Sequence, residues 1–406
     1  MATVLKGAKI FDGTGKNVIE NGVIVIGDDG RIRRVGENID FSGEKGITYD
    51  LKGKFVLPGL IDVHVHLGAH GMADTYKENL VEEKFRAIRA AKEMENTLNA
   101  GVTTVRNCGS VNHLDFSIKK AVEQGLIKGP RILACGQILS VTCSGTEYFN
   151  GLYRVCDGEN GFRKAAREQL AKGADCLKVM ATGAIMNPGG VPGAEQPDVR
   201  ELEKITKEGN KLGKKVAAHA HGAQGIKNAV NAGVATIEHG SLADEEALSL
   251  MIRNNIYLVT TLLAGYLMLE HGIKDGVPGF MIEKSKRIRA LRIDAVKRAI
   301  RAGVQVAMGS DAGISPYNYH GRNAWEVIVY VKEGLMSAEQ AIISATQNAA
   351  QACGWEKDIG TIEEGKIADI IVVDGSPLEN IEVLGSEKNI KMVFKDGKPV
   401  KHISPV

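Results

Sequence analysis

The central part of the chain alternates short apolar runs with longer amphipathic segments. Segments such as 80–101 and 199–213 have helical periodicity, and both end at a glycine, as helices commonly do. Strands that alternate with helices form βαβ units and a parallel sheet. The strand-like runs span residues 59–66, 102–109, 131–136, 176–183, 216–221, 234–240, 256–262 and 304–313. Eight such strands predict an α/β fold of the (β/α)8 TIM-barrel type.

A doubly wound sheet would also place helices between parallel strands. Such sheets often carry a glycine-rich loop for a dinucleotide or a phosphate directly after the first strand. No loop of that kind follows residues 59–66. The barrel is therefore the architecture that we predict.

Both ends of the chain are rich in short strands. They alternate apolar and polar residues between Gly/Asp turns, and 27-GDDG-30 is a clear hairpin signal. The strand-like segments are residues 3–11, 22–36, 47–59, 367–375 and 391–400. We predict one small β-sandwich domain assembled from residues 1–57 and 358–406, next to a barrel domain of residues 58–357.

Composition excludes several classes of partner. The 44% hydrophobic content allows a large core, and the net charge of +2 gives no reason to expect nucleic acid or a membrane surface. We find no run of about 18 apolar residues and no signal-peptide pattern. The six cysteines include no Cys-x-x-Cys pair, which favours free thiols in a reducing compartment. A soluble cytoplasmic protein is expected.

Side chains that can bind a metal stand at the C-terminal ends of the predicted strands, apart from a lysine within the fourth. These positions are His64, His66, Lys178, His219, His221, His239 and Asp311. A buried strand has no structural need for imidazole or charge. The C-terminal ends of TIM-barrel strands meet at the mouth, where active sites lie. We therefore expect these side chains to converge on one site.

The histidines suggest metal ligands. His64 and His66 are two residues apart on one strand, so both face the same side. His219 and His239 end adjacent strands, and imidazole is a usual ligand of zinc and other divalent metals. A single buried histidine is more often structural. His221 shares the face of His219 and is a ligand, a substrate donor or a support for a ligand; we favour the roles other than ligand.

Asp311 and Lys178 are the charged members of this set. A carboxylate at Asp311 can coordinate a metal and accept a proton from its bound water, although a helix N-cap is the structural alternative. The strand-end position favours the catalytic role. The ammonium of Lys178 would repel metal ions, whereas a neutral or modified lysine would not. The alternative is a lysine whose charge reaches solvent.

Six segments together resemble the amidohydrolase superfamily over essentially the whole chain. They are 57-LPGLIDVHVHLG-68, 176-CLKVMATG-183, 216-VAAHAHG-222, 236-TIEHG-240, 309-GSDAG-313 and 360-GTIEEGKIADIIVVDG-375. Within it the chain is similar to the imidazolonepropionase-related branch, with Xaa-Pro dipeptidase-like enzymes, carboxypeptidases of lysine or arginine specificity and ochratoxin-type amidases. Relatives commonly assemble, so a homo-oligomer is expected.

The resemblance implies two divalent metal ions. Lys178 would be carboxylated by carbon dioxide, and its carbamate would bridge both ions. The other ligands would be His64, His66 and Asp311 at the more buried α metal, and His219 and His239 at the β metal. Zinc is the expected metal, and these ligands also suit manganese or cobalt.

A mechanism follows from these parts. A hydroxide bridging the two ions would attack an amide carbonyl that the β metal polarises. Asp311 would take the proton and return it to the leaving amine. Tyr266 matches a tyrosine that helps to polarise the carbonyl in relatives, with ordinary packing as an equal alternative. The loop 316-PYNYHGRNAWE-326 resembles a His-Gly-x-Asn loop of the family, so His320 and Arg322 are candidate substrate contacts, with loop anchoring and helix capping as the alternative.

One segment departs from the pattern of the peptidase-like members. Those members carry a Gly-Gly-His element in the loop after the third strand, whereas this chain has 141-VTCSGTEYFNG-151, without a histidine. A substrate-binding group of those relatives is therefore missing or replaced.

The preferred function is hydrolysis of an amide bond in a small substrate, either a dipeptide or an N-acyl amino acid. The alternative is a cyclic-amide hydrolase or a deaminase that acts on a ring, as imidazolonepropionase does. Deaminases of the superfamily generally use one metal and lack the bridging lysine, so Lys178 argues against that version. A silent metal-binding or assembly protein would lack Asp311 or several of the histidines, and the set is complete.

Overall fold

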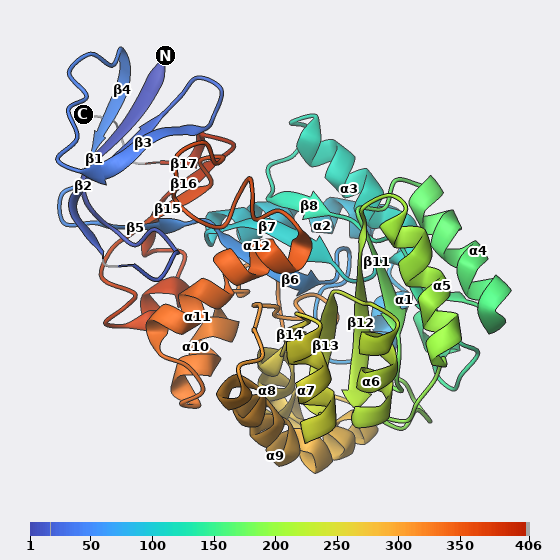
Figure 1. Cartoon of the computed structure of the whole chain (residues 1–406). Coiled ribbons are helices and arrows are strands. Elements are labelled where there is room, and N and C mark those ends of the chain that lie inside the picture. The colour runs from blue at the N-terminus through green and yellow to red at the C-terminus, as the bar shows by residue number, and fades with distance from the viewer. Residues whose placement is uncertain (17, 403–406) are drawn as a thin grey trace.

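The computed structural model describes residues 1–16 and 18–402. A helix-covered α/β part carries strands of the middle of the chain, and a separate sheet holds strands from both ends (Figure 1). The helices are α1 (Thr75–Asn79), α2 (Glu83–Asn99), α3 (Leu114–Glu123), α4 (Gly158–Ala171), α5 (Val199–Asn210), α6 (Ala223–Asn231), α7 (Glu245–Arg253), α8 (Leu262–His271), α9 (Gly279–Ala302), α10 (Trp325–Lys332), α11 (Ala338–Ser344) and α12 (Gln347–Cys353). Short 3-10 turns are η1 (Val111–His113), η2 (Thr146–Phe149), η3 (Ile273–Asp275) and η4 (Ile381–Gly385).

The two ends of the chain share one sheet. Its order is β17-β16-β15-β5-β1-β2-β3, and β4 also pairs with β1. The strands are β1 (Ala2–Ile10), β2 (Ile19–Ile26), β3 (Ile32–Glu37), β4 (Gly46–Asp50), β5 (Phe55–Pro58), β15 (Ile370–Val373), β16 (Ile390–Lys395) and β17 (Lys398–Lys401). The two ends meet where β15 runs antiparallel to β5, with Ile370 opposite Pro58.

The middle of the chain forms two parallel sheets, ordered β6-β7-β8 and β10-β9-β11-β12-β13-β14. Their strands are β6 (Leu60–Val65), β7 (Val102–Asn107), β8 (Arg131–Leu133), β9 (Ile138–Ser140), β10 (Tyr153–Val155), β11 (Cys176–Met180), β12 (Lys215–Gly222), β13 (Thr236–Leu242) and β14 (Tyr257–Val259). Strands such as β6, β7 and β11 are buried at every residue because helices cover the outside of the sheets. This arrangement is a TIM-barrel-like α/β fold.

The eighth predicted strand, residues 304–313, is not a continuous strand, so that prediction was wrong in detail. It makes isolated bridges from Val306 to Leu258 and from Ala312 to Val65. Backbone hydrogen bonds still tie it to both neighbours: Leu258 N donates to Gln305 O at 2.9 Å, and Val63 N donates to Met308 O at 2.9 Å. The backbone also departs from strand geometry near the end of the segment, where Asp311 has a positive φ of 62°.

The helices begin where the sequence places capping residues. At α5, Asp198 accepts a hydrogen bond from the backbone of Glu201, whose side chain accepts one from the backbone of Asp198. The helix buries Leu202 and Ile205 on one face. Each such helix packs its apolar face on the strands and leaves the strand ends free for polar side chains.

No helix in residues 1–16 and 18–402 combines the length and the apolar character that crossing a membrane requires. All six cysteines are free thiols.

Candidate active site

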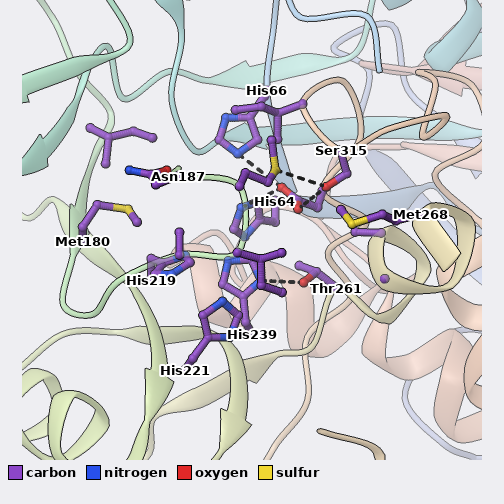
Figure 2. A pocket seen from close by; sticks show the side chains of 18 of the residues that line it. His64, His66, Met180, Asn187, His219, His221, His239, Thr261, Met268 and Ser315 are labelled. Atoms are coloured by element: carbon purple, nitrogen blue, oxygen red, sulfur yellow. Dashed lines mark hydrogen bonds and ion pairs between the residues drawn. The ribbon is translucent and has the colours of Figure 1, made fainter. Parts of the chain in front are cut away.

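The predicted ligands gather at the C-terminal ends of β6, β11, β12 and β13 (Figure 2). The rings of His64 and His239 have centroids 5.2 Å apart, and those of His219 and His239 are 4.5 Å apart. His64, His219 and His239 therefore converge from three separate strands. All three side chains are buried.

Asp311 brings the segment after β14 and α9 to the same place. Its Oδ1 lies 3.4 Å from His64 Nε2 and 3.3 Å from His66 Nε2. Ser315 Oγ donates a hydrogen bond to Oδ2 of the same carboxylate at 2.8 Å (Figure 2). Ligand atoms of His64, His66 and Asp311 lie within 4.8 Å of one another, so they can hold one metal ion.

His219 and His239 can serve a second ion. His219 Nε2 is buried and has no hydrogen-bond partner among the described residues. His239 Nδ1 lies 2.7 Å from Thr261 Oγ1. Buried polar atoms are nearly always satisfied, so an unpaired imidazole nitrogen beside three other histidines fits the role of a metal ligand.

Lys178 lies among these histidines. Its side chain is 2% exposed, and Nζ lies 3.5 Å from His64 Nε2. Nζ forms no salt bridge with a carboxylate in the part of the chain that the structure describes. The alternative of a lysine whose charge reaches solvent is therefore excluded. An unpaired buried ammonium is costly, so the position suits a lysine that is modified.

The ring nitrogens that face away from the site are held by other groups. His66 Nδ1 donates to Gly109 O at 3.0 Å, and His64 Nδ1 lies 2.6 Å from Glu238 Oε2. Arg106 Nη2 donates to the other oxygen of Glu238 at 2.8 Å. These bonds leave Nε2 of both histidines for the site.

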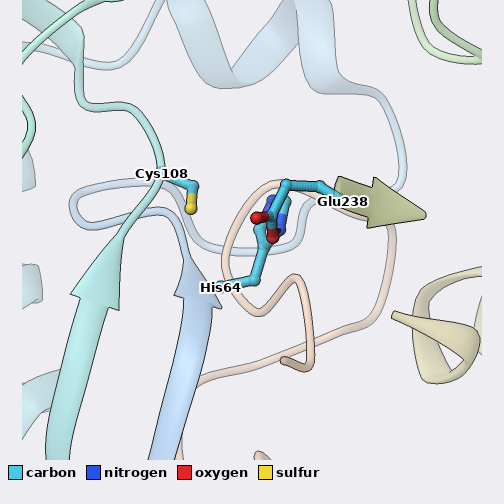
Figure 3. Close-up of side chains that lie close together, drawn as sticks. All are labelled: His64, Cys108 and Glu238. Carbon is cyan, nitrogen blue, oxygen red and sulfur yellow. Dashed lines mark hydrogen bonds and ion pairs between the residues drawn. The ribbon is translucent and has the colours of Figure 1, made fainter. Parts of the chain in front are cut away.

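Cys108 also lies close to His64 and Glu238 (Figure 3). Ligand atoms of these three residues lie within 4.8 Å of one another, so they form a second group that could hold a metal ion. Burial raises the pKa of the Cys108 thiol to about 11, so it stays protonated at neutral pH. Burial would raise the pKa of Glu238 too, but the charge of Arg106 and the hydrogen bond from His64 hold it at about 2. Burial thus disfavours the thiolate that a metal would need, and Glu238 is already paired with Arg106. Glu238 therefore holds the ring of His64 through Nδ1, on the side away from the cavity.

Burial sets the protonation states that metal binding needs. Burial and the charge of Lys178 lower the pKa of His64 to about 4, and burial lowers the pKa of His219 and His239 far below the usual value. Burial alone would raise the pKa of Asp311, but its contacts with His66, His64 and Ser315 hold it well below the usual range. At neutral pH the imidazoles are neutral and the carboxylate is ionised.

Three residues of the site have strained backbones. The φ angles are 74° at His239, 49° at Thr261 and 62° at Asp311. These values lie in the left-handed region, which residues other than glycine rarely adopt. Gly309 shows how tightly the backbone is packed here, because a Cβ at that position would lie 2.7 Å from Cβ of His64. Strain of this kind clusters at functional sites.

A cavity of about 670 Å³ opens onto the site. Apart from the predicted metal ligands, its wall holds the polar residues Tyr153, Asn187, His221, Thr261, Ser285, Arg292 and Ser315. The apolar lining includes Ile138, Phe149, Met180, Ile185, Met186, Met268 and Ile314. His221 lies in this wall with Nδ1 2.8 Å from Ser241 Oγ, and its ring centroid is 4.6 Å from that of His219.

The structure does not bring three of the predicted substrate contacts to this wall. Tyr266 lies in α8 with a side chain that is 44% exposed, and it lines a neighbouring cavity. Arg322 is exposed, with its guanidinium 5.5 Å from the ring centre of Tyr319. His320 is buried behind the site, with Nε2 3.2 Å from His66 O. In the same loop Asn323 Nδ2 donates to Asp62 at 2.8 Å, so the loop anchors β6.

Sequence reasoning missed Ser315 and Arg292. Ser315 follows Asp311 by four residues in a glycine-rich loop. Its closeness to Asp311 in the sequence was the available signal that the two side chains could meet. Arg292 lies within α9 on the stripe of buried residues that includes Ser285, Ile288 and Ala299. A charged residue on the buried stripe of a helix was the signal there.

Known proteins resemble this chain over most of its length. The model of the amidohydrolase family matches residues 55–400. Ochratoxinase from Aspergillus niger is 30% identical over 431 residues, which cover 98% of this chain and 86% of that protein. The solved structure of an Xaa-Pro dipeptidase with methionine bound in its active site has a TM-score of 0.91 and 33% identity, over 99% of this chain and 100% of the other. A prolidase complexed with N-methylphosphonate-L-proline has the same TM-score and coverage at 32% identity.

The matched region extends from β5 through β16 and contains every predicted ligand. The similarity to ochratoxinase and to the Xaa-Pro dipeptidase structure covers nearly the whole chain. The chain belongs to the amidohydrolase family and is a hydrolase that acts on carbon–nitrogen bonds.

Proposed function

We propose that this hydrolase binds two divalent metal ions and cleaves an amide bond in a dipeptide or an N-acyl amino acid. The observation that carries the proposal is the convergence of three neutral histidines and Asp311 around the buried Nζ of Lys178. The relatives point to the same substrate class, since their names include a dipeptidase and a prolidase, and a bound methionine and a proline derivative.

Each ion would have its own protein ligands, and both would share Lys178. His64, His66 and Asp311 would hold one ion, and His219 and His239 the other. Carbon dioxide would convert Lys178 to a carbamate, which removes the buried positive charge and supplies two oxygens. We infer zinc, because neutral imidazoles and carboxylates suit it, and the same ligands also accept manganese or cobalt.

The residues of the chain perform the proton transfers. When bound, the ions would supply a Lewis acid for the carbonyl and lower the pKa of a water molecule. Asp311, fixed by Ser315, would take the proton of that water and deliver it to the leaving nitrogen. His221, with Nδ1 anchored near Ser241, would present Nε2 to the substrate carbonyl or to its carboxyl group.

We also infer that β6, β7, β8, β11, β12, β13, β14 and segment 304–312 close into a barrel within residues 58–357. Support comes from the backbone hydrogen bonds of segment 304–312 to both β14 and β6. Residues 1–57 and 358–406, of which residue 17 and residues 403–406 lie outside the described part, are the proposed β-sandwich domain, since the described strands of both ends pair with one another. The free thiols support a cytoplasmic location. Members of the family commonly assemble, which supports a homo-oligomer.

A substrate screen tests the proposed reaction. Metal-loaded protein is mixed with N-acyl amino acids, dipeptides and cyclic amides, and the release of free amine is followed by mass spectrometry. We expect turnover of linear amides, and none after treatment with a chelator. Turnover of cyclic amides alone would favour the ring-acting alternative, and chelator-resistant turnover would contradict the metal mechanism.

A further inference from the structure

Arg292 is a charged residue in the wall of the active-site cavity that the reaction above does not use. Its side chain is 6% exposed, although α9 carries Arg287 and Arg289 on its exposed side. Arg292 lines the cavity together with the metal-binding histidines. A buried guanidinium at this place needs an explanation, because burying an uncompensated charge is costly.

One nitrogen of Arg292 fixes the side chain to the end of β14. Nη2 donates to Thr260 O and Thr261 O at 2.5 Å each, and to Thr261 Oγ1 at 2.7 Å. Thr261 Oγ1 is also the partner of His239 Nδ1, at 2.7 Å. The guanidinium is therefore held rigidly beside a ligand of the second ion.

The remaining donors of Arg292 are unused. Nε is buried without a hydrogen-bond partner, and Nη1 forms no hydrogen bond within the described residues. Next to Nη1 lies Gly265, where a Cβ would come within 3.1 Å, so glycine leaves Nη1 uncovered on that side. An unused N–H group of a fixed guanidinium is a charge-assisted donor for an oxygen of a carboxylate.

No acidic side chain neutralises Arg292 within the part of the chain that the structure describes. Burial lowers the pKa of Arg292, and Glu326 is the acid that opposes this effect most. The oxygens of Glu326, however, accept hydrogen bonds from Thr260 Oγ1 at 2.8 Å and from the backbone N–H groups of Leu262 and Leu263. Asp311 is the only acid in the cavity wall, and it faces His64 and His66. The cavity therefore offers a positive charge that lacks an anion.

We propose that Arg292 binds a carboxylate of the substrate, so that the enzyme selects amides whose amine part is an amino acid with a free α-carboxylate. This inference rests on the proposed function and names the residue that recognises the carboxylate of its substrates. The apolar wall formed by Ile185, Met186 and Met268 suits a substrate with an apolar side chain.

Two matched compounds test this selectivity. N-acetyl-L-phenylalanine and N-acetylphenethylamine carry the same amide and ring and differ in the carboxylate. The wild type should prefer the first by about 100-fold in kcat/KM, because a charge-assisted pair is lost with the second. Arg292→Met should reduce the preference to within about threefold, through loss of activity on the acid alone, while Arg287→Met should leave it unchanged. Equal losses on both compounds would show that Arg292 only holds Thr261, and would overturn the proposal.

Equilibrium binding separates this inference from the reaction itself. Calorimetry with L-phenylalanine and phenethylamine needs no turnover, so it decides the role of Arg292 even if neither amide is cleaved. The wild type should bind L-phenylalanine at least about 10-fold more tightly, and Arg292→Met should lose that difference. A difference that survives in Arg292→Met would place the carboxylate on the metal ions instead. If Arg292→Met does not fold, equal binding of the two compounds by the wild type overturns the proposal.

Discussion

His64 Nδ1 lies 2.6 Å from Glu238 Oε2, at the base of the site and away from the cavity. Arg106 Nη2 donates to the second oxygen of Glu238 at 2.8 Å, and all three side chains are fully buried. A histidine that binds a metal through Nε2 must donate from Nδ1, and a carboxylate partner fixes that tautomer. Glu238, itself held by Arg106, therefore orients His64, the first ligand of the proposed metal centre.

Glu238→Gln should weaken metal binding by about 10- to 100-fold, as loss of such a partner commonly does. It also leaves the charge of Arg106 buried without its counter-charge, so thermal stability should fall. Competition with a chelator measures the affinity. Glu246→Gln is the control, because Glu246 is an exposed partner of Lys227. Equal affinities in the two variants would contradict the role of Glu238.

Lys178→Ala should lose bound metal and activity together, because it removes the ligand that both ions are proposed to share. Bicarbonate with a short carboxylic acid should restore part of both, since a free carboxylate can occupy the place of the carbamate. Metal analysis and the amide assay give the readout. Lys172→Ala is the control, because Lys172 is exposed and precedes Lys178 in the sequence without belonging to the site. Unchanged metal content in Lys178→Ala would count against the carbamate.

Asp311→Asn should keep the fold and lose turnover by about 100- to 10,000-fold, because an amide oxygen does not take up a proton at neutral pH. Circular dichroism checks the fold, and kcat checks the proton transfer. Asp294→Asn changes an exposed carboxylate of α9 and should leave kcat unchanged. Near-normal turnover in Asp311→Asn would rule out its proton role.

Cys108→Ala should keep the metal content of the wild type. Burial raises the pKa of the thiol to about 11, which disfavours the thiolate form that binds a metal, and Cys108 lies beside the partner of His64 and outside the proposed ligand set. Elemental analysis at pH 7 gives the answer. Loss of an ion in this variant would move a metal to the group of His64, Cys108 and Glu238.

Strand positions explain what the sequence could predict. His64, His66, His219 and His239 follow the period of two along their strands, and parallel strands bring their C-terminal ends together, so a site at that end could be predicted. The geometry of segment 304–313 could not, because the positive φ of Asp311 is imposed by packing and leaves no mark in hydrophobic periodicity.

Helix rotation explains what the sequence could not predict. Tyr266 follows β14 by a few residues, but which face of α8 meets the cavity depends on how the whole helix packs, and Tyr266 lies on the exposed side. Arg292 stands among several arginines of α9, and only its contacts with Thr260 and Thr261 distinguish it from the rest. Contacts between distant segments decide both cases.

Metal stoichiometry tests the central claim most directly. Protein purified from cells grown with zinc or manganese is analysed by elemental mass spectrometry against its amino-acid concentration. The convergence of His64, His66, Lys178, His219, His239 and Asp311 predicts close to two ions per chain. A value close to one ion per chain would contradict the binuclear site.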